Sequence, residues 1–119
     1  MSKRYERSTD VLDIWTKAVN AKQLDAVLDL YGPDAVLQPT FANRFLRGRD
    51  GLKWYFSQLA EREALEVVIH EKTVTVQSVG DVEVLSGIYR WGYEIDGDAL
   101  KFEARFTFVS DTCERLTGW

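Results

Sequence analysis

The apolar residues of the first half of the chain recur at helical spacing. Between residues 8 and 31 they repeat every three or four positions, which predicts two helices separated at Asn20-Ala21. Gly32-Pro33 ends the second helix, because glycine and proline favour helix termination. A third helix is predicted to begin at Asp50, a good N-cap residue. Its apolar positions are Leu52, Tyr55, Phe56 and Leu59.

The rest of the chain is rich in residues that favour β-strands and is punctuated by turn residues. Helices that come first and antiparallel strands that come later are typical of an α+β domain. Two short strands and three long strands are predicted, at residues 35–38, 44–47, 65–79, 82–95 and 100–109.

The last two long strands form a hairpin around Asp96-Gly97, a strong signal for a two-residue turn. This turn fixes a register in which Trp91 lies opposite Phe102 and Arg90 lies opposite Glu103. Because side chains alternate across a strand, the hairpin has two different faces. One face is aromatic and carries Tyr89, Trp91, Tyr93, Leu100, Phe102, Phe106 and Phe108.

The opposite face of the hairpin carries a group of charged residues. Arg90 and Arg105 are diagonal neighbours, and Glu103 lies opposite Arg90. One interpretation is a solvated sheet face with structural ion pairs. The other interpretation is the polar lining of a concave pocket.

Composition narrows the class of protein. A chain of 119 residues with 45% hydrophobic residues predicts one globular domain, residues 1–119. A net charge of −4 without a basic cluster argues against nucleic acid or an anionic membrane as partner, and no apolar run has transmembrane length. The lone cysteine, Cys113, fits a reducing cytoplasm.

The sequence gives no sign of a cofactor or metal. No G-x-G-x-x-G fingerprint for a flavin or dinucleotide occurs. One histidine, His70, and one cysteine are too few for a zinc site. We therefore expect neither cofactor nor metal, and we interpret His70 as a structural residue.

Four segments resemble the association domain of calcium/calmodulin-dependent protein kinase II and its stand-alone bacterial relatives. They are Y-G-P-D-A-V-L-Q-P-T (31–40), G-L-K-W-Y-F (51–56), S-G-I-Y-R-W (86–91) and E-A-R-F-T-F-V (103–109). The resemblance implies the cone-shaped nuclear-transport-factor-2-like fold, in which three N-terminal helices pack on a curved, mostly antiparallel sheet. That fold also includes polyketide cyclases of the SnoaL type and ketosteroid isomerases.

The resemblance also implies a pocket and an interface. Arginines of the family line a deep pocket, and the matching motifs place them at Arg90 and Arg105. Both would then point into the cone, and the aromatic face would be the outer one. Self-association is expected through Tyr89, Trp91, Tyr93, Phe102 and Phe106.

The chain departs from this pattern at its end. The family has one more strand after the loop that follows Val109, whereas this sequence stops at Trp119. The final strand is therefore expected to be missing, which would leave one edge of residues 100–109 and the short strand 35–38 without a neighbour.

Two functions compete at this point. In the first, the chain is a homo-oligomeric binding module whose pocket holds a small anion or carboxylate with Arg90 and Arg105, tuned by Glu103. In the second, it is a SnoaL-like isomerase, cyclase or hydrolase in which Glu103 is the catalytic base and Tyr55 donates a hydrogen bond. Arginines beside Glu103 would lower its pKa and weaken it as a base, so we prefer the binding module.

Overall fold

The computed structural model of the chain describes residues 9–41 and 43–111. Two helices, a two-stranded sheet and a third helix come first, and a four-stranded antiparallel sheet follows, which confirms the α+β class. The helices are α1 (Thr9–Asn20), α2 (Leu24–Asp29) and α3 (Gly48–Ala60), with a short 3-10 helix η1 (Glu71–Thr73). The strands are β1 (Val36–Leu37), β2 (Leu46–Arg47), β3 (Glu63–Ile69), β4 (Thr75–Val79), β5 (Val82–Ile95) and β6 (Asp98–Asp111).

Helix α1 is fixed to the sheet at both its apolar side and its last residue. The Asn20 amide donates to the Val67 carbonyl (2.9 Å) and accepts from the Val67 N–H (2.7 Å). This side chain continues the backbone pairing of β3 and ties the end of α1 to it. The buried positions of α1 are Val11, Leu12, Trp15, Ala18 and Val19, as its spacing predicted.

Helix α3 begins two residues before the expected N-cap. Arg47 occupies the N-cap position without a side-chain hydrogen bond, and Asp50 lies in the first turn. Gly48 has a φ of +71° and donates its N–H to the Ala35 carbonyl (2.9 Å). A contact distant in sequence therefore sets the start of the helix, while Asp50 favours it through the helix dipole.

The sheet is built around β5. Strand β6 pairs with β5 along its whole length, and β3 and β4 share the other edge of β5. The single strand predicted at residues 65–79 is therefore wrong, because η1 interrupts it. There Thr73 Oγ1 accepts from the Ile88 N–H (2.9 Å) and donates to the His70 carbonyl (2.7 Å), so a side chain replaces the strand pairing.

The predicted register of the hairpin is confirmed. Trp91 pairs with Phe102, Arg90 with Glu103, and Ile95 with Asp98. Asp96 and Gly97 have φ values of 53° and 85°, as a two-residue type I′ turn requires.

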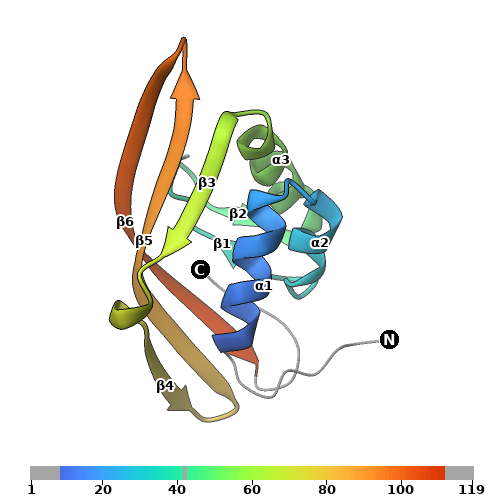
Figure 1. Ribbon diagram of the computed structural model, residues 1–119. Coiled ribbons are helices and arrows are strands. Elements are labelled where there is room, and N and C mark those ends of the chain that lie inside the picture. The colour runs from blue at the N-terminus through green and yellow to red at the C-terminus, as the bar shows by residue number, and fades with distance from the viewer. Residues whose placement is uncertain (1–8, 42, 112–119) are drawn as a thin grey trace.

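The prediction of which hairpin face is outermost is wrong. Helices α1, α2 and α3 all lie on one side of β5 and β6, and that side is the aromatic face (Figure 1). Trp91 is 1% exposed within a single chain, so it is a core residue and not an interface residue. Residues expected in the interface are therefore mostly buried: Tyr89, Trp91, Tyr93 and Phe106, with Phe102 40% exposed.

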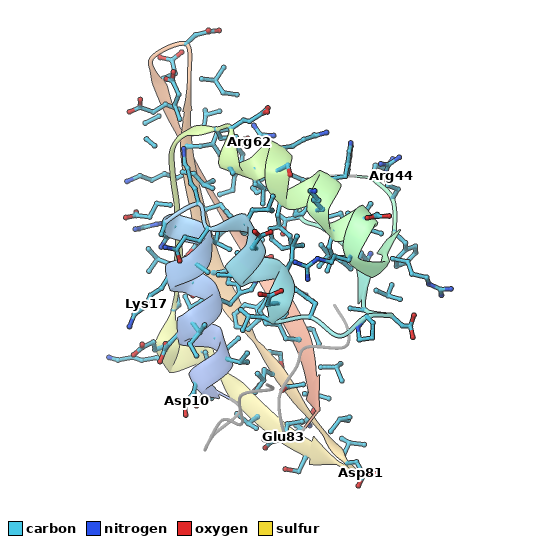
Figure 2. All side chains as sticks on the ribbon, turned by 90° about the vertical axis from the view of Figure 1, so that its right-hand side faces the viewer. Asp10, Lys17, Arg44, Arg62, Asp81 and Glu83 are labelled. Carbon is cyan, nitrogen blue, oxygen red and sulfur yellow. The ribbon has the colours of Figure 1, made fainter. Side chains whose placement is uncertain are left out.

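The aromatic face is buried because α1 has an apolar stripe that packs on it. An amphipathic helix has to cover apolar surface, and the aromatic face offers far more of it than the charged face does. Figure 2 looks onto the helical layer, with the sheet behind it and Lys17 of α1 pointing to solvent. The charged face of the hairpin is consequently the outer one.

The missing strand was expected to follow Trp119, and residues 112–119, which include most of the loop expected before it, lie outside the described part of the chain. Within the described ranges, β6 pairs with β5 alone and β1 pairs with β2 alone. Across the same ranges, no helix has the length and apolar character needed to cross a membrane.

Two glycines of β5 offer a matched test of the packing. A Cβ at Gly87 would lie 3.0 Å from the Phe106 ring and 3.2 Å from Thr73 Oγ1, whereas a Cβ at Gly92 meets nothing closer than 3.7 Å. We expect Gly87→Ala to lower the free energy of unfolding by about 1–3 kcal/mol, because the buried ring has to move. Urea denaturation of both variants checks this. Gly92→Ala should stay close to the wild type, and equal effects at the two positions would contradict it.

Candidate functional site

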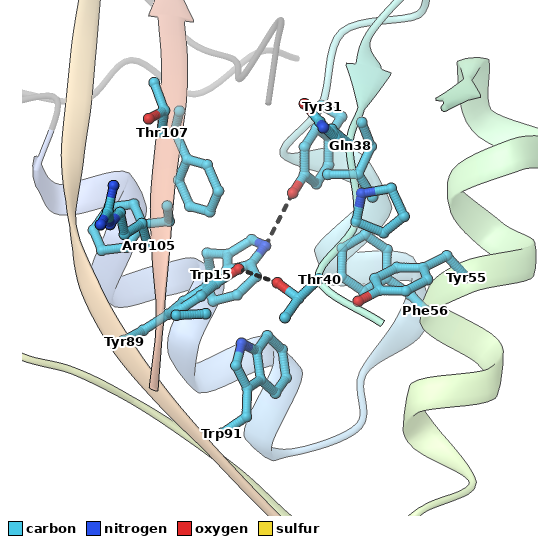
Figure 3. A pocket seen from close by; sticks show the side chains of 15 residues that line it. Trp15, Tyr31, Gln38, Thr40, Tyr55, Phe56, Tyr89, Trp91, Arg105 and Thr107 are labelled. Atoms are coloured by element: carbon cyan, nitrogen blue, oxygen red, sulfur yellow. Dashed lines mark hydrogen bonds between the residues drawn. The ribbon is translucent and has the colours of Figure 1, made fainter. Parts of the chain in front are cut away.

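A cavity of about 320 Å³ lies between the helices and the aromatic face of the sheet (Figure 3). Five parts of the chain contribute to it: α1, Tyr31 after α2, the end of β1 with the segment that follows it, α3 and the β5–β6 hairpin. Its lining residues are Trp15, Tyr31, Leu37, Gln38, Pro39, Thr40, Tyr55, Phe56, Tyr89, Trp91, Ala104, Arg105, Phe106, Thr107 and Phe108.

The inner wall of the cavity is an aromatic cluster centred on Trp15. Its ring centroid lies 6.2 Å from that of Tyr89, 5.9 Å from Trp91 and 5.3 Å from Phe108. The contacts with Trp91 and Phe108 are edge-to-face, a favoured geometry for aromatic pairs. These rings make the wall rigid and apolar.

Polar groups of the lining residues form hydrogen bonds around the cavity. The Trp15 indole N–H donates to the Tyr31 hydroxyl (3.1 Å), and the hydroxyls of Thr40 and Tyr89 share a hydrogen bond of 2.6 Å. The Tyr55 hydroxyl accepts from the Phe41 N–H (3.3 Å). The cavity is therefore apolar along its walls and polar where these groups meet.

The Tyr31 and Tyr55 phenols of the cavity stay protonated at neutral pH. Burial raises the pKa of Tyr31 well above its ordinary value, and burial also raises the pKa of Tyr55. Both oxygens already accept a hydrogen bond, so each hydroxyl keeps its hydrogen to donate.

Arg62 closes one side of the aromatic layer. Its guanidinium lies 4.3 Å from the centroid of the Tyr93 ring and 5.7 Å from that of Phe41. The residue is half-buried between α3 and β3, where it packs against aromatic faces as a cation–π partner.

The structure separates the expected site residues. Tyr55 lines the cavity, and Arg105 borders it with a side chain directed away from it, beyond β6 (Figure 3). Arg90 and Glu103 are not among the lining residues. The expectation that Arg90, Arg105 and Glu103 together line the cone is therefore wrong. These residues lie on one face of the hairpin, and the helices cover the opposite, aromatic face.

Glu103 lies on the outer face beside His70. The two side chains are 3.6 Å apart, and that of Glu103 is 65% exposed. This is not the apolar enclosure that a carboxylate needs to become a general base. No group of three or more possible metal ligands occurs among residues 9–41 and 43–111, and Cys113 lies outside these ranges.

The sequence reasoning missed most of the polar cavity residues. Tyr89 and Trp91 were expected in an interface, and neither Tyr31 nor Thr40 was predicted as a site residue. One available signal was the presence of tyrosines and tryptophans at apolar positions of several elements, since their polar tips need partners when buried.

The architecture defines a class of fold that solved structures share. A nuclear transport factor 2 (NTF2-like) superfamily protein from Salmonella enterica has a TM-score of 0.78 at 11% identity, covering 92% of this chain and 83% of that one. The fold is thus the nuclear-transport-factor-2-like one, as the sequence motifs implied.

The family follows from the sequence itself. The model of the calcium/calmodulin dependent protein kinase II association domain matches residues 6–117, and the chain belongs to that family. A Xanthomonas campestris structure provisionally assigned to this domain is 25% identical, with a TM-score of 0.78 over 98% of this chain and 91% of that one. The S. rosetta CaMKII hub has a TM-score of 0.75 at 19% identity, over 92% and 88% of the two chains. No curated protein matches this chain.

The raised tyrosine pKa values predict a loss of stability in alkali. The folded-state pKa of each phenol lies above the ordinary value of 10.0. The contribution of the two phenols to the free energy of unfolding is therefore fully present below pH 10 and falls as the pH rises above it. Urea unfolding between about pH 9 and about pH 11 should show the decline. In the double variant Tyr31→Phe with Tyr55→Phe the decline should be smaller, even if stability is lower throughout. An equally steep decline would show that these phenols are not responsible.

Proposed function

We propose that this protein is a homo-oligomeric association module, working in the cytoplasm, whose subunits pair through the outer face of the sheet. The chain belongs to a family described as an association domain, and a solved hub shares its fold. Each subunit also holds the aromatic cavity, which we propose as a site for a small ligand.

The composition of the outer sheet face supports the proposal of self-association. It is formed by alternate residues of β3, β5 and β6, and α1, α2 and α3 all lie on the opposite side (Figure 1). Apolar and charged side chains are mixed on it: Val68, Ile88, Arg90, Glu103 and Arg105.

This mixture suits pairing with a second copy of the same chain. A two-fold interface brings one patch against itself, so a patch that holds both signs of charge can be self-complementary. The arginines of one copy can then meet Glu103 of the other, while Val68 and Ile88 supply apolar contact. We therefore assign Arg90 and Arg105 to association and not to a carboxylate in the cavity.

The enzyme alternative has weaker support. Its base, Glu103, lies on the outer face, and the cavity lining within the described part of the chain contains no Asp, Glu or His. A general base has to lie within hydrogen-bonding reach of its substrate. Ligand binding is therefore the function that the cavity supports best.

A double substitution on the outer face tests association. Val68→Glu places a carboxylate opposite Arg90, and Ile88→Glu places one opposite Arg105, so each new charge has a partner within its own sheet. The apolar contact is lost, and Arg90 and Arg105 are paired within their own chain and no longer free to meet Glu103 of the other copy, so we expect light scattering to change from a multiple of 13.7 kDa to the monomer mass.

Lys17→Glu is the matched control, because Lys17 is exposed on α1, on the helical side of the molecule. This variant should keep the native mass. A wild-type monomer would refute the proposal, and a double variant that keeps its native mass would place the interface elsewhere.

A further inference from the structure

One polar group in the cavity wall lacks a partner. The Trp91 indole N–H is buried and makes no hydrogen bond within the described part of the chain. Trp91 itself is 1% exposed, so bulk water does not reach it. Its nitrogen lies on the side of the ring that faces the hydroxyls of Tyr89 and Thr40 (Figure 3). An unpaired buried donor is costly, and a bound acceptor would remove this cost.

The neighbouring hydroxyls add further donors. Tyr31 and Tyr55 each accept one hydrogen bond and keep a hydrogen to donate. Thr40 and Tyr89 share one hydrogen bond, which uses one of their two hydroxyl hydrogens. Three donor hydrogens of the lining, on Trp91, Tyr31 and Tyr55, therefore have no acceptor among the described residues.

The described lining offers nothing that would balance a charged ligand. Arg105 is the one charged residue among the lining residues, and its side chain points away from the cavity. A buried ion without a counter-charge is strongly disfavoured.

The size and walls of the cavity define the rest of the ligand. A volume of about 320 Å³ lies at the small end of ligand pockets, which begin at about 300 Å³. Trp15, Phe56 and Phe106 present flat apolar surfaces to it. A ring system of one or two rings can pack against such surfaces.

We propose that the cavity binds a small, planar, uncharged molecule with a carbonyl oxygen, and that this oxygen accepts the Trp91 indole N–H together with a neighbouring hydroxyl. This inference rests on the cavity being the ligand site of the proposed function. It does not depend on self-association, because every residue that it uses belongs to one chain.

Three probes of similar size separate the possible ligand classes. Indanone has a fused ring and a ketone, indane is the same hydrocarbon without the oxygen, and benzoate is a planar anion. We expect indanone to bind about fivefold to tenfold more tightly than indane in calorimetric titration, as one good hydrogen bond provides. Indanone should also shift the Trp91 indole N–H resonance downfield in proton–nitrogen correlation spectra.

Substitutions identify the side chains that cause the preference for indanone over indane. Trp91→Phe keeps an aromatic ring and removes the N–H, so the preference for indanone over indane should disappear. Trp54→Phe is the matched control, because Trp54 is exposed on α3 and does not line the cavity. If Trp91→Phe does not fold, Tyr55→Phe and the wild-type indole resonance still test the proposal. We expect Tyr55→Phe to reduce the preference and Trp54→Phe to leave it unchanged.

Three results would overturn the proposal. The first is equal binding of indanone and indane, or binding of neither, by the wild-type protein. The second is tighter binding of benzoate, which would restore the expectation of an anionic ligand. The third is binding of indanone that does not shift the Trp91 indole N–H resonance. A monomeric wild type that still prefers indanone would refute association and leave this inference standing.

Discussion

The packing of Trp15 against the aromatic face of β5 is the interaction on which the rest of the structure depends. The Trp15 ring contacts Tyr89, Trp91 and Phe108, so one residue of α1 touches both strands of the hairpin. Asn20 then fixes the end of the same helix to Val67 of β3. Together these contacts decide which face of the sheet becomes the interior.

The burial of the aromatic face determines where the charged residues of the hairpin lie and what they can bind. Arg90 and Glu103 are paired across the hairpin, and alternation places them on the face opposite Trp91 and Phe102. Once helices cover the aromatic face, these charges lie on the surface, where water and a second chain can reach them. Arginines that would have bound an anion inside the cone become candidates for contacts between subunits.

The cavity exists because large aromatic residues fill the interior incompletely and carry polar tips. Trp15 and Tyr31 satisfy each other, as do Thr40 and Tyr89, whereas Trp91 has no partner in the described chain. Natural interiors seldom leave such a donor unpaired, and the exceptions call for a specific explanation. Here the explanation that fits the surrounding volume is a bound acceptor.

The chain alone determined the local structure well. Helical spacing located α1 and α2, and Asp96-Gly97 specified the turn and the complete register of β5 with β6, because these features depend on neighbouring residues. The break at η1 depended instead on Thr73 bonding to Ile88, and the start of α3 on Gly48 bonding to Ala35. Neither contact is visible in a local pattern.

The site was the least predictable part. Alternation separates Arg90 from Trp91, but it does not say which of the two faces the helices will cover. The motifs identified the family and the fold. Tyr55, predicted as a ligand-binding residue, lines the cavity, and its binding role stays a prediction. The tertiary structure decided which other residues line the cavity, because α1 buries the most apolar surface by packing on the aromatic face.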